Sequence, residues 1–256
     1  MELVTAIAVI CLLLVAVAFS PLGLGGGILF VPIVHYMLDW EIREALVASL
    51  TLVLMVALGS SMAHSKSGHA DLEAAKLGRI SAVPSAVIGV ILSGAVIHAI
   101  GDIGIKLIAS LIMFFVIERT LRKALSKDDT TNVQLPISAN KNRYIAGSSF
   151  AGVSAGMLGI GGGAILVTLN RSVLKMDAKK AAGTSYLVAA TVTPVALLSH
   201  LILSRNLSII VDDAGIIGII LVPILVFASA YYGAKYAIKY LPKQIVSYVF
   251  LFVVSI

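Results

Sequence analysis

The sequence predicts an all-α polytopic membrane protein with two inverted repeats of about five membrane segments each, and a V-shaped glycine-elbow hairpin in each repeat. Three observations predict this fold: little charge, an internal duplication and two matched glycine clusters. Of the 256 residues, 59% are apolar and 12% charged, whereas soluble domains have roughly 45–50% apolar and about 25% charged residues. The charges lie in short islands between apolar runs of roughly membrane-spanning length.

The duplication has a nearly constant offset. LGLGGGILFVP at 22–32 matches LGIGGGAILVT at 158–168, which lies 136 residues later. At the same offset, EALVASLTLV (44–53) matches KAAGTSYLVA (180–189). Matches of this kind extend over about 100 residues, which predicts a true internal repeat rather than a similarity of apolar composition.

Each repeat contains five apolar segments in chain order. In the first repeat, residues 1–118, the segments span 3–20, 22–38, 45–63, 78–100 and 104–117. In the second repeat, residues 143–256, they span 143–157, 160–174, 181–203, 214–240 and 244–256. Residues 119–142 are polar and are expected to form a mobile cytoplasmic linker. Glu2 replaces the basic start of a signal peptide, so the first segment is expected to remain as a helix.

Basic residues predict the orientation, because cytoplasmic loops of membrane proteins are enriched in Lys and Arg. If the first two segments of each repeat return the chain to its starting side, 16 of the 19 basic residues share the side of the linker. The other topology gives a split of 10 to 9. The first topology places the linker in the cytoplasm and both termini outside, and it inverts the second repeat. Basic loops also account for the net charge of +6, so we expect a lipid bilayer, and no nucleic acid, as partner.

A glycine cluster separates the first two segments of each repeat. Glycine in a helix interior costs up to about 1 kcal/mol relative to alanine, so the clusters predict sharp turns inside the membrane. The segment 143–157 would rise only about 22 Å as a helix, less than the roughly 30 Å hydrocarbon core. This favours a hairpin that enters from one face and turns back. Inverted repeats of this kind are typical of secondary transporters, which bind substrate near the midplane.

The clusters also predict chemistry. A helix that begins at a glycine turn presents unpaired N–H groups and a positive dipole end, and glycine lets a ligand approach the backbone closely. Two such ends near the midplane would bind a small anion without a buried cation. The alternative is that the glycines only allow close helix packing. The candidate substrate-binding glycines are Gly25, Gly26, Gly27, Gly161, Gly162 and Gly163.

Further polar residues are candidates for the same site, for gating or for coupling. Hydroxyls in the segment after each hairpin are candidates to line the site, with hydrogen bonding inside their own helix as the alternative. Asn170 is either a lining residue or a helix end. His64 and His200 occupy matched positions and are candidates for proton coupling, or for purely structural hydrogen bonds. The hydroxyl candidates are Ser49, Thr51, Thr184, Ser185 and Tyr186.

Arg171 aligns with His35 at the far end of each glycine helix, and both are candidates for gating. Arg171 also fits a positive-inside anchor. All 13 carboxylates lie at segment ends or in loops, so no mid-membrane carboxylate is expected to carry ions. The sequence has no standard zinc motif and no nucleotide-binding loop. We therefore expect no metal, no cofactor and no catalysis.

With these motifs, the chain resembles the TauE/SafE family of sulfite and organosulfonate exporters. The resemblance rests on LGLGGGILFVPIV and LGIGGGAILVTL, with EALVASL and KAAGTSYL as support, and spans nearly the whole chain. It implies a secondary transporter, an exporter of small sulfur oxyanions, that works by alternating access in an inner membrane. Thr168-Leu169-Asn170 departs from Pro32-Ile33-Val34 of the first repeat, which bears on substrate choice.

Other functions stay open alongside the exporter. An anion channel of the same fold would use the same glycine turns, and a membrane assembly factor or a membrane-embedded enzyme would bind no anion there. A homodimer is also open.

Overall fold

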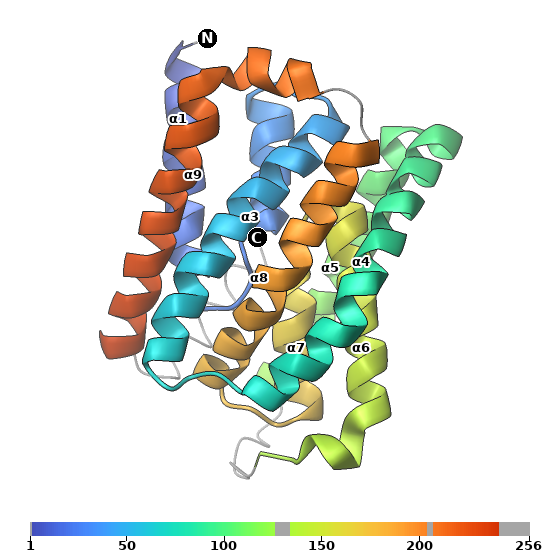
Figure 1. Cartoon of the computed structure of the whole chain (residues 1–256), viewed down its shortest axis with the longest axis vertical. Coiled ribbons are helices and arrows are strands. Elements are labelled where there is room, and N and C mark those ends of the chain that lie inside the picture. The colour runs from blue at the N-terminus through green and yellow to red at the C-terminus, as the bar shows by residue number, and fades with distance from the viewer. Residues whose placement is uncertain (1, 126–133, 204–206, 241–256) are drawn as a thin grey trace.

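The protein is described from a computed structural model, which covers residues 2–125, 134–203 and 207–240. Within these ranges every regular element is helical and none is a strand, so the all-α class is confirmed (Figure 1). The segment expected at 244–256 lies outside the described residues. The helices are α1 (Glu2–Phe19), α2 (Gly27–Pro32), the π-helix η1 (Ile33–Met37), α3 (Ile42–Lys66), α4 (Leu72–Ile100), α5 (Asp102–Leu125), α6 (Ile137–Leu158), α7 (Gly163–Val173), α8 (Ala178–Leu203) and α9 (Leu207–Tyr240).

Four of the described helices are long and apolar enough to cross a membrane. Large apolar side chains such as Leu14, Ile88 and Ile202 are exposed on the outside of the bundle, as expected for helices that face lipid rather than water. Shorter apolar helices cover Leu3–Phe19 and Gly27–Met37. The four spans are Ile42–Lys66, Leu72–Ile100, Ala178–Leu203 and Gly218–Tyr240.

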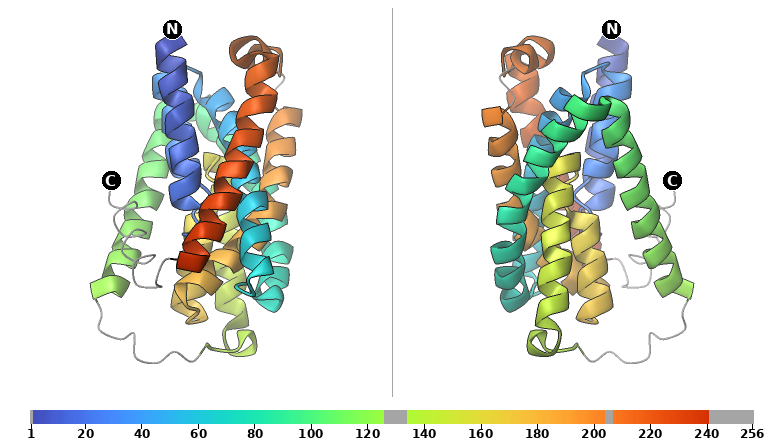
Figure 2. Two further views of the ribbon diagram at one scale, coloured as in Figure 1. Left: turned by 90° about the vertical axis from the view of Figure 1, so that its left-hand side faces the viewer. Right: turned by 90° about the vertical axis from the view of Figure 1, so that its right-hand side faces the viewer.

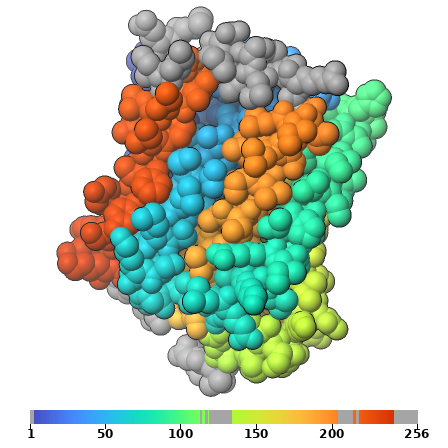
Figure 3. All heavy atoms as spheres, viewed as in Figure 1, coloured from blue at the N-terminus to red at the C-terminus, as the bar shows by residue number. Residues whose placement is uncertain are grey.

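Two helix pairs turn back inside the bundle. In Figure 2, α1 runs from the N-terminus to the middle of the molecule, and the pair α6 and α7 reaches the middle from the opposite end. The upper end, as drawn in Figure 1, is where α3 begins and α4 and α8 end. The lower end is where α3 ends and α4, α6 and α8 begin. Figure 3 shows α9, α3, α8 and α4 side by side across one face.

Helix boundaries differ from the predicted segments at the centre of the chain. α6 begins at Ile137, with a kink at Asn140, and has 22 residues, so the argument from a short segment at 143–157 is wrong. Hydropathy marked only the apolar part of a helix whose first two turns are polar. α5 likewise continues to Leu125, so much of the expected linker loop is helical. The short helix is α7, whose 11 residues rise about 16 Å.

Glycines bring α4 and α6 into backbone contact. A Cβ atom on Gly89, Gly152 or Gly156 would collide with a backbone carbonyl of the facing helix. Small residues at such interfaces let membrane helices pack closely. The close contact fixes α6, and with it the start of α7, against one of the spanning helices.

Candidate functional site

The first glycine turn, residues 20–26, joins α1 to α2. Gly23, Gly25 and Gly26 have φ values of 83°, 79° and 86°, and Gly26 is the N-cap of α2. Side chains other than glycine rarely adopt this left-handed region. The glycines are therefore required by the backbone path of the turn.

The second glycine turn, residues 159–162, repeats this conformation between α6 and α7. Gly159, Gly161 and Gly162 have φ values of 67°, 71° and 67°, and Gly162 is the N-cap of α7. Each residue lies 136 positions after its counterpart in the first turn. The matched sequences thus fold into matched local structures.

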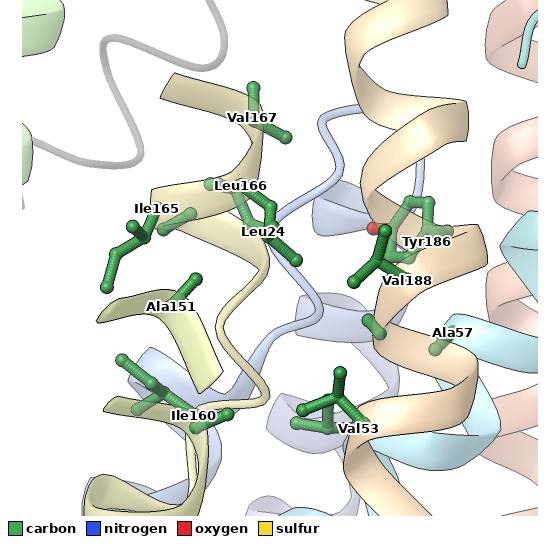
Figure 4. Packing of buried hydrophobic residues seen from close by; sticks show 14 of the residues in the cluster. Leu24, Val53, Ala57, Ala151, Ile160, Ile165, Leu166, Val167, Tyr186 and Val188 are labelled. Carbon is green, nitrogen blue, oxygen red and sulfur yellow. The ribbon is translucent and has the colours of Figure 1, made fainter. Parts of the chain in front are cut away.

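The two turns pack directly on each other in the core. A Cβ atom on Gly27 would lie 2.5 Å from Ile160 Cα, and one on Gly163 would lie 2.6 Å from Gly23 O. Leu24 and Ile160 are both buried, and Figure 4 shows them among the apolar side chains of the core, together with Tyr186 of α8. The first residues of α2 and α7 therefore meet at the centre of the molecule.

A serine from each of α3 and α8 holds the glycine turn of the opposite half. Ser49 Oγ donates a hydrogen bond to Gly159 O over 2.8 Å. Ser185 Oγ lies 3.1 Å from both Gly23 O and Gly163 O and shares its proton between them. Both serines are fully buried. The structure thus brings these two predicted hydroxyls to the turns.

Tyr186 occupies the first glycine turn. Its hydroxyl donates to Phe19 O over 2.6 Å and accepts a hydrogen bond from Gly25 N over 3.4 Å. Leu50 stands at the matched position of the first half and has no hydroxyl to offer Gly161. Tyr186 therefore satisfies one of the N–H groups predicted to bind substrate.

The threonine candidates make other contacts. Thr51 Oγ1 donates to Val47 O in its own helix over 3.0 Å. Thr184 Oγ1 accepts from Asp71 N over 2.9 Å, and so ties α8 to the chain before α4.

The two matched histidines bond to carbonyls near the turns. His200 Nε2 lies 2.7 Å from Gly156 O, and His64 Nε2 lies 3.4 Å from Ser20 O. Because a carbonyl only accepts, Nε2 carries the proton in both rings. These bonds fix both side chains beside the glycine turns.

Asn170, Arg171 and His35 lie away from the turns. Asn170 is buried at the lower end of α7, where its Oδ1 accepts from Tyr144 OH over 2.9 Å and its Nδ2 donates to Ala181 O over 3.1 Å. Arg171 is the next residue along α7. His35 of η1 lies at the upper end, with its Nδ1 2.7 Å from Trp40 O.

Sequence reasoning missed Thr193. Its Oγ1 atom is buried and has no hydrogen-bond partner in the described part of the chain. A Cβ atom on Gly161 would lie 3.5 Å from it. The matched residue of the first half is Ala57. A hydroxyl that is present in only one of the two repeats is the sequence feature that could have identified Thr193 as a candidate. In the described ranges, no group of three His, Cys, Asp or Glu residues is placed to hold a metal.

Comparison with known proteins agrees with the helical membrane architecture. The family model described as "Sulfite exporter TauE/SafE" matches residues 8–256. A "Probable membrane transporter protein" of Haemophilus influenzae is 27% identical over 188 residues, which cover 69% of this chain and 67% of that protein. No solved structure gives a significant match.

Proposed function

Because the chain belongs to the sulfite exporter TauE/SafE family, we propose that it is an exporter of small sulfur oxyanions such as sulfite or organosulfonates. It works as a secondary transporter by alternating access in an inner membrane. The H. influenzae relative carries the name of a membrane transporter, which supports the same class. The family is one of transporters rather than of enzymes.

The proposal includes two inverted repeats related by a pseudo-twofold axis through the glycine turns. Paired contacts support it. The Ser49–Gly159 hydrogen bond has its mate in Ser185–Gly23, at the 136-residue offset. The histidine bonds to Gly156 and Ser20 form a second such pair. Such pairs arise when two halves of a molecule have the same internal geometry and face each other.

The substrate site of this exporter is the place where the N-termini of α2 and α7 meet. The observation that carries the proposal is the packing of Gly27 and Gly163 against the opposite turn. Backbone N–H groups and dipole ends of both helices converge there and favour an anion. Thr193 of α8 lies beside Gly161 and offers an additional donor, because its hydroxyl has no partner in the part of the chain that the structure describes. A sulfur oxyanion has several acceptor oxygens that suit such donors.

The lower end faces the cytoplasm in this proposal. Most lysines and arginines of the described helices lie at this end, at the ends of α3, α7 and α9 and at the starts of α4, α6 and α8. The upper end carries Arg43 and Lys106 among the described helices. Cytoplasmic faces of membrane proteins are enriched in such residues. This orientation leaves the N-terminus outside.

Reconstitution into proteoliposomes tests the function. We expect sulfite flux that saturates with concentration and shows counterflow, as a carrier requires. Flux without saturation at rates above about 10⁵ per second would instead support a channel, because domain motions take microseconds to milliseconds. Absence of both sulfite binding and flux would overturn the transporter and favour an assembly factor.

Substitutions in the turns test the site. Gly26→Val and Gly162→Val are expected to abolish flux. Gly68→Val is the matched control, since Gly68 has the same left-handed backbone (φ 71°) in open space. Thr193→Val removes a hydroxyl from the site with little change in packing volume. If the glycine variants do not fold, the flux of this variant tests the site assignment. Unchanged flux in all three site variants would overturn the site.

A further inference from the structure

A cavity of about 240 Å³ lies at the upper end between α3, α4 and α8. One water occupies about 30 Å³ in the liquid, so a small oxyanion fits together with several waters. Larger organic ligands use pockets of roughly 300–1,000 Å³. The size of the cavity therefore matches a small, partly hydrated anion.

Three polar side chains line this cavity among apolar neighbours: Arg43, Ser93 and His200. Arg43 is exposed at the start of α3 and supplies a positive charge. Ser93 is 1% exposed, and its Oγ has no hydrogen-bond partner within the described residues. None of the described residues that line the cavity is acidic. The lining suits an anion, because guanidinium and hydroxyl groups donate to oxyanions.

The cavity adjoins the second glycine turn. Leu46 lines it, and a Cβ atom on Gly159 would lie 3.0 Å from Leu46 Cδ2. His200 connects the cavity to the last turn of α6 through its bond to Gly156 O. Thr193 lies two helical turns before His200, on the same face of α8. Leu46 therefore lies between the cavity and the second glycine turn.

The matched region at the lower end is closed. Lys179 corresponds to Arg43, and it is buried with its Nζ donating to Ile238 O over 2.8 Å. Gly233 corresponds to Gly94 of the cavity lining, but a Cβ atom there would lie 2.7 Å from Ser20 Oγ. A Cβ atom on Gly94 meets nothing within 4 Å. Among the described residues, the upper end therefore has an open cavity where the equivalent place at the lower end is filled.

We propose that the upper cavity is a docking site for a small oxyanion on its way to or from the second glycine turn, held by Arg43 and Ser93. The region of Lys179, His64 and Gly233 is the same site in its closed form at the opposite end. This proposal rests on the proposed transport function.

Calorimetric titration of the purified full-length protein with sulfite, under anaerobic conditions, tests it. Arg43→Gln is expected to weaken binding about tenfold, as for the loss of one charge-assisted hydrogen bond. Gly94→Leu should weaken it at least as much by filling the cavity. Its fold should tolerate the change, because leucine favours helix over glycine and the space is empty. The fluorescence of Trp40, the single tryptophan and three residues before Arg43, should change on binding.

Two matched controls separate local from general effects. Lys106→Gln removes a cation at the same end outside the cavity. Gly218→Leu adds a side chain to a helix at a place where, among the described residues, only Ala214 Cβ lies within 4 Å, at 3.5 Å. Both should bind sulfite like the wild type. Sulfite binding that Arg43→Gln and Gly94→Leu leave unchanged would overturn the docking site but not the transporter. A wild type that neither binds nor moves sulfite would overturn both.

Discussion

Gly25 and Gly161 adopt the same left-handed conformation in the two glycine turns, with φ of 79° and 71°, but different hydroxyls surround them. Tyr186 takes the N–H of Gly25 and bonds on to Phe19 O. Near Gly161, Thr193 brings a hydroxyl with no partner among the described residues. We infer that Tyr186 already occupies one N–H group of the first turn, while the second turn leaves a nearby hydroxyl available to a ligand. The two turns therefore share a backbone conformation but differ in the side chains around it.

The largest expected effect tests whether the turns are equivalent in packing. Gly27→Val and Gly163→Val should each destabilise the protein by about 3 kcal/mol, because the added atoms overlap backbone of the opposite turn. Thermal unfolding in detergent measures this, with Gly218→Val as control. Similar losses of stability in both variants would show that the two turns are equivalent in packing and differ only in the hydroxyls around them. A loss in only one would show that the turns do not support each other equally.

Tyr186→Phe should have the next largest effect. It leaves Gly25 N and Phe19 O without their partner in the core, which costs about 1–3 kcal/mol for buried polar groups. Denaturation in detergent, compared with the wild type, measures the loss. A neutral result would contradict a structural role for the Tyr186 hydroxyl and leave the N–H of Gly25 available to a ligand.

Thr193→Val is expected to show the opposite pattern. Stability should stay within about 0.5 kcal/mol of the wild type or rise, because the removed hydroxyl has no partner to lose. Sulfite binding should weaken about fivefold, as for one neutral hydrogen bond. Calorimetry on the same preparation measures both quantities. A stability loss without a binding defect would assign Thr193 to the fold.

The last prediction concerns an ion pair at the lower end of the molecule. Asp71, which precedes α4 outside the spanning segments, lies 3.3 Å from Lys180 Nζ. Burial alone would raise the pKa of the Asp71 carboxyl, but the Ala74 N–H, the Gln134 amide and the Lys180 ammonium outweigh it and lower the pKa. A lowered pKa gives stability that is present at neutral pH and lost as the carboxyl protonates.

Asp71→Asn keeps the helix cap and removes the charge. It should cost about 1 kcal/mol at pH 7. The difference from the wild type should begin to shrink as the pH approaches the ordinary carboxyl pKa of about 3.9, and should vanish only below the lowered pKa of the folded state. Unfolding curves at several pH values measure this. A difference that grows on acidification would contradict the ion pair.

Much of the fold followed from the sequence because its signals are local. Apolar runs predict helices, and a conserved offset predicts that Gly26 and Gly162 share a conformation. The beginning of α6 escaped prediction because helical residues before the predicted segment, such as Lys141 and Asn142, are polar, and hydropathy does not report helix formation outside the membrane.

The site was only partly predictable because contacts between distant segments decide it. Ser49 and Ser185 reach the turns as expected, whereas Thr51 bonds within its helix and Asn170 lies at the far end of α7. Whether a hydroxyl is free or occupied depends on its neighbour in space. Tyr186 of α8 bonds to the first turn, whereas the hydroxyl of Thr193 in the same helix has no partner among the described residues.

The glycine contacts between α4 and α6 have a mechanical consequence. Two helices whose backbones touch at several places can slide or separate only by losing all of these contacts together, so α4 and α6 behave as one rigid unit. The second glycine turn follows α6, and Ser93 belongs to α4. These contacts therefore fix the separation between the second glycine turn and Ser93.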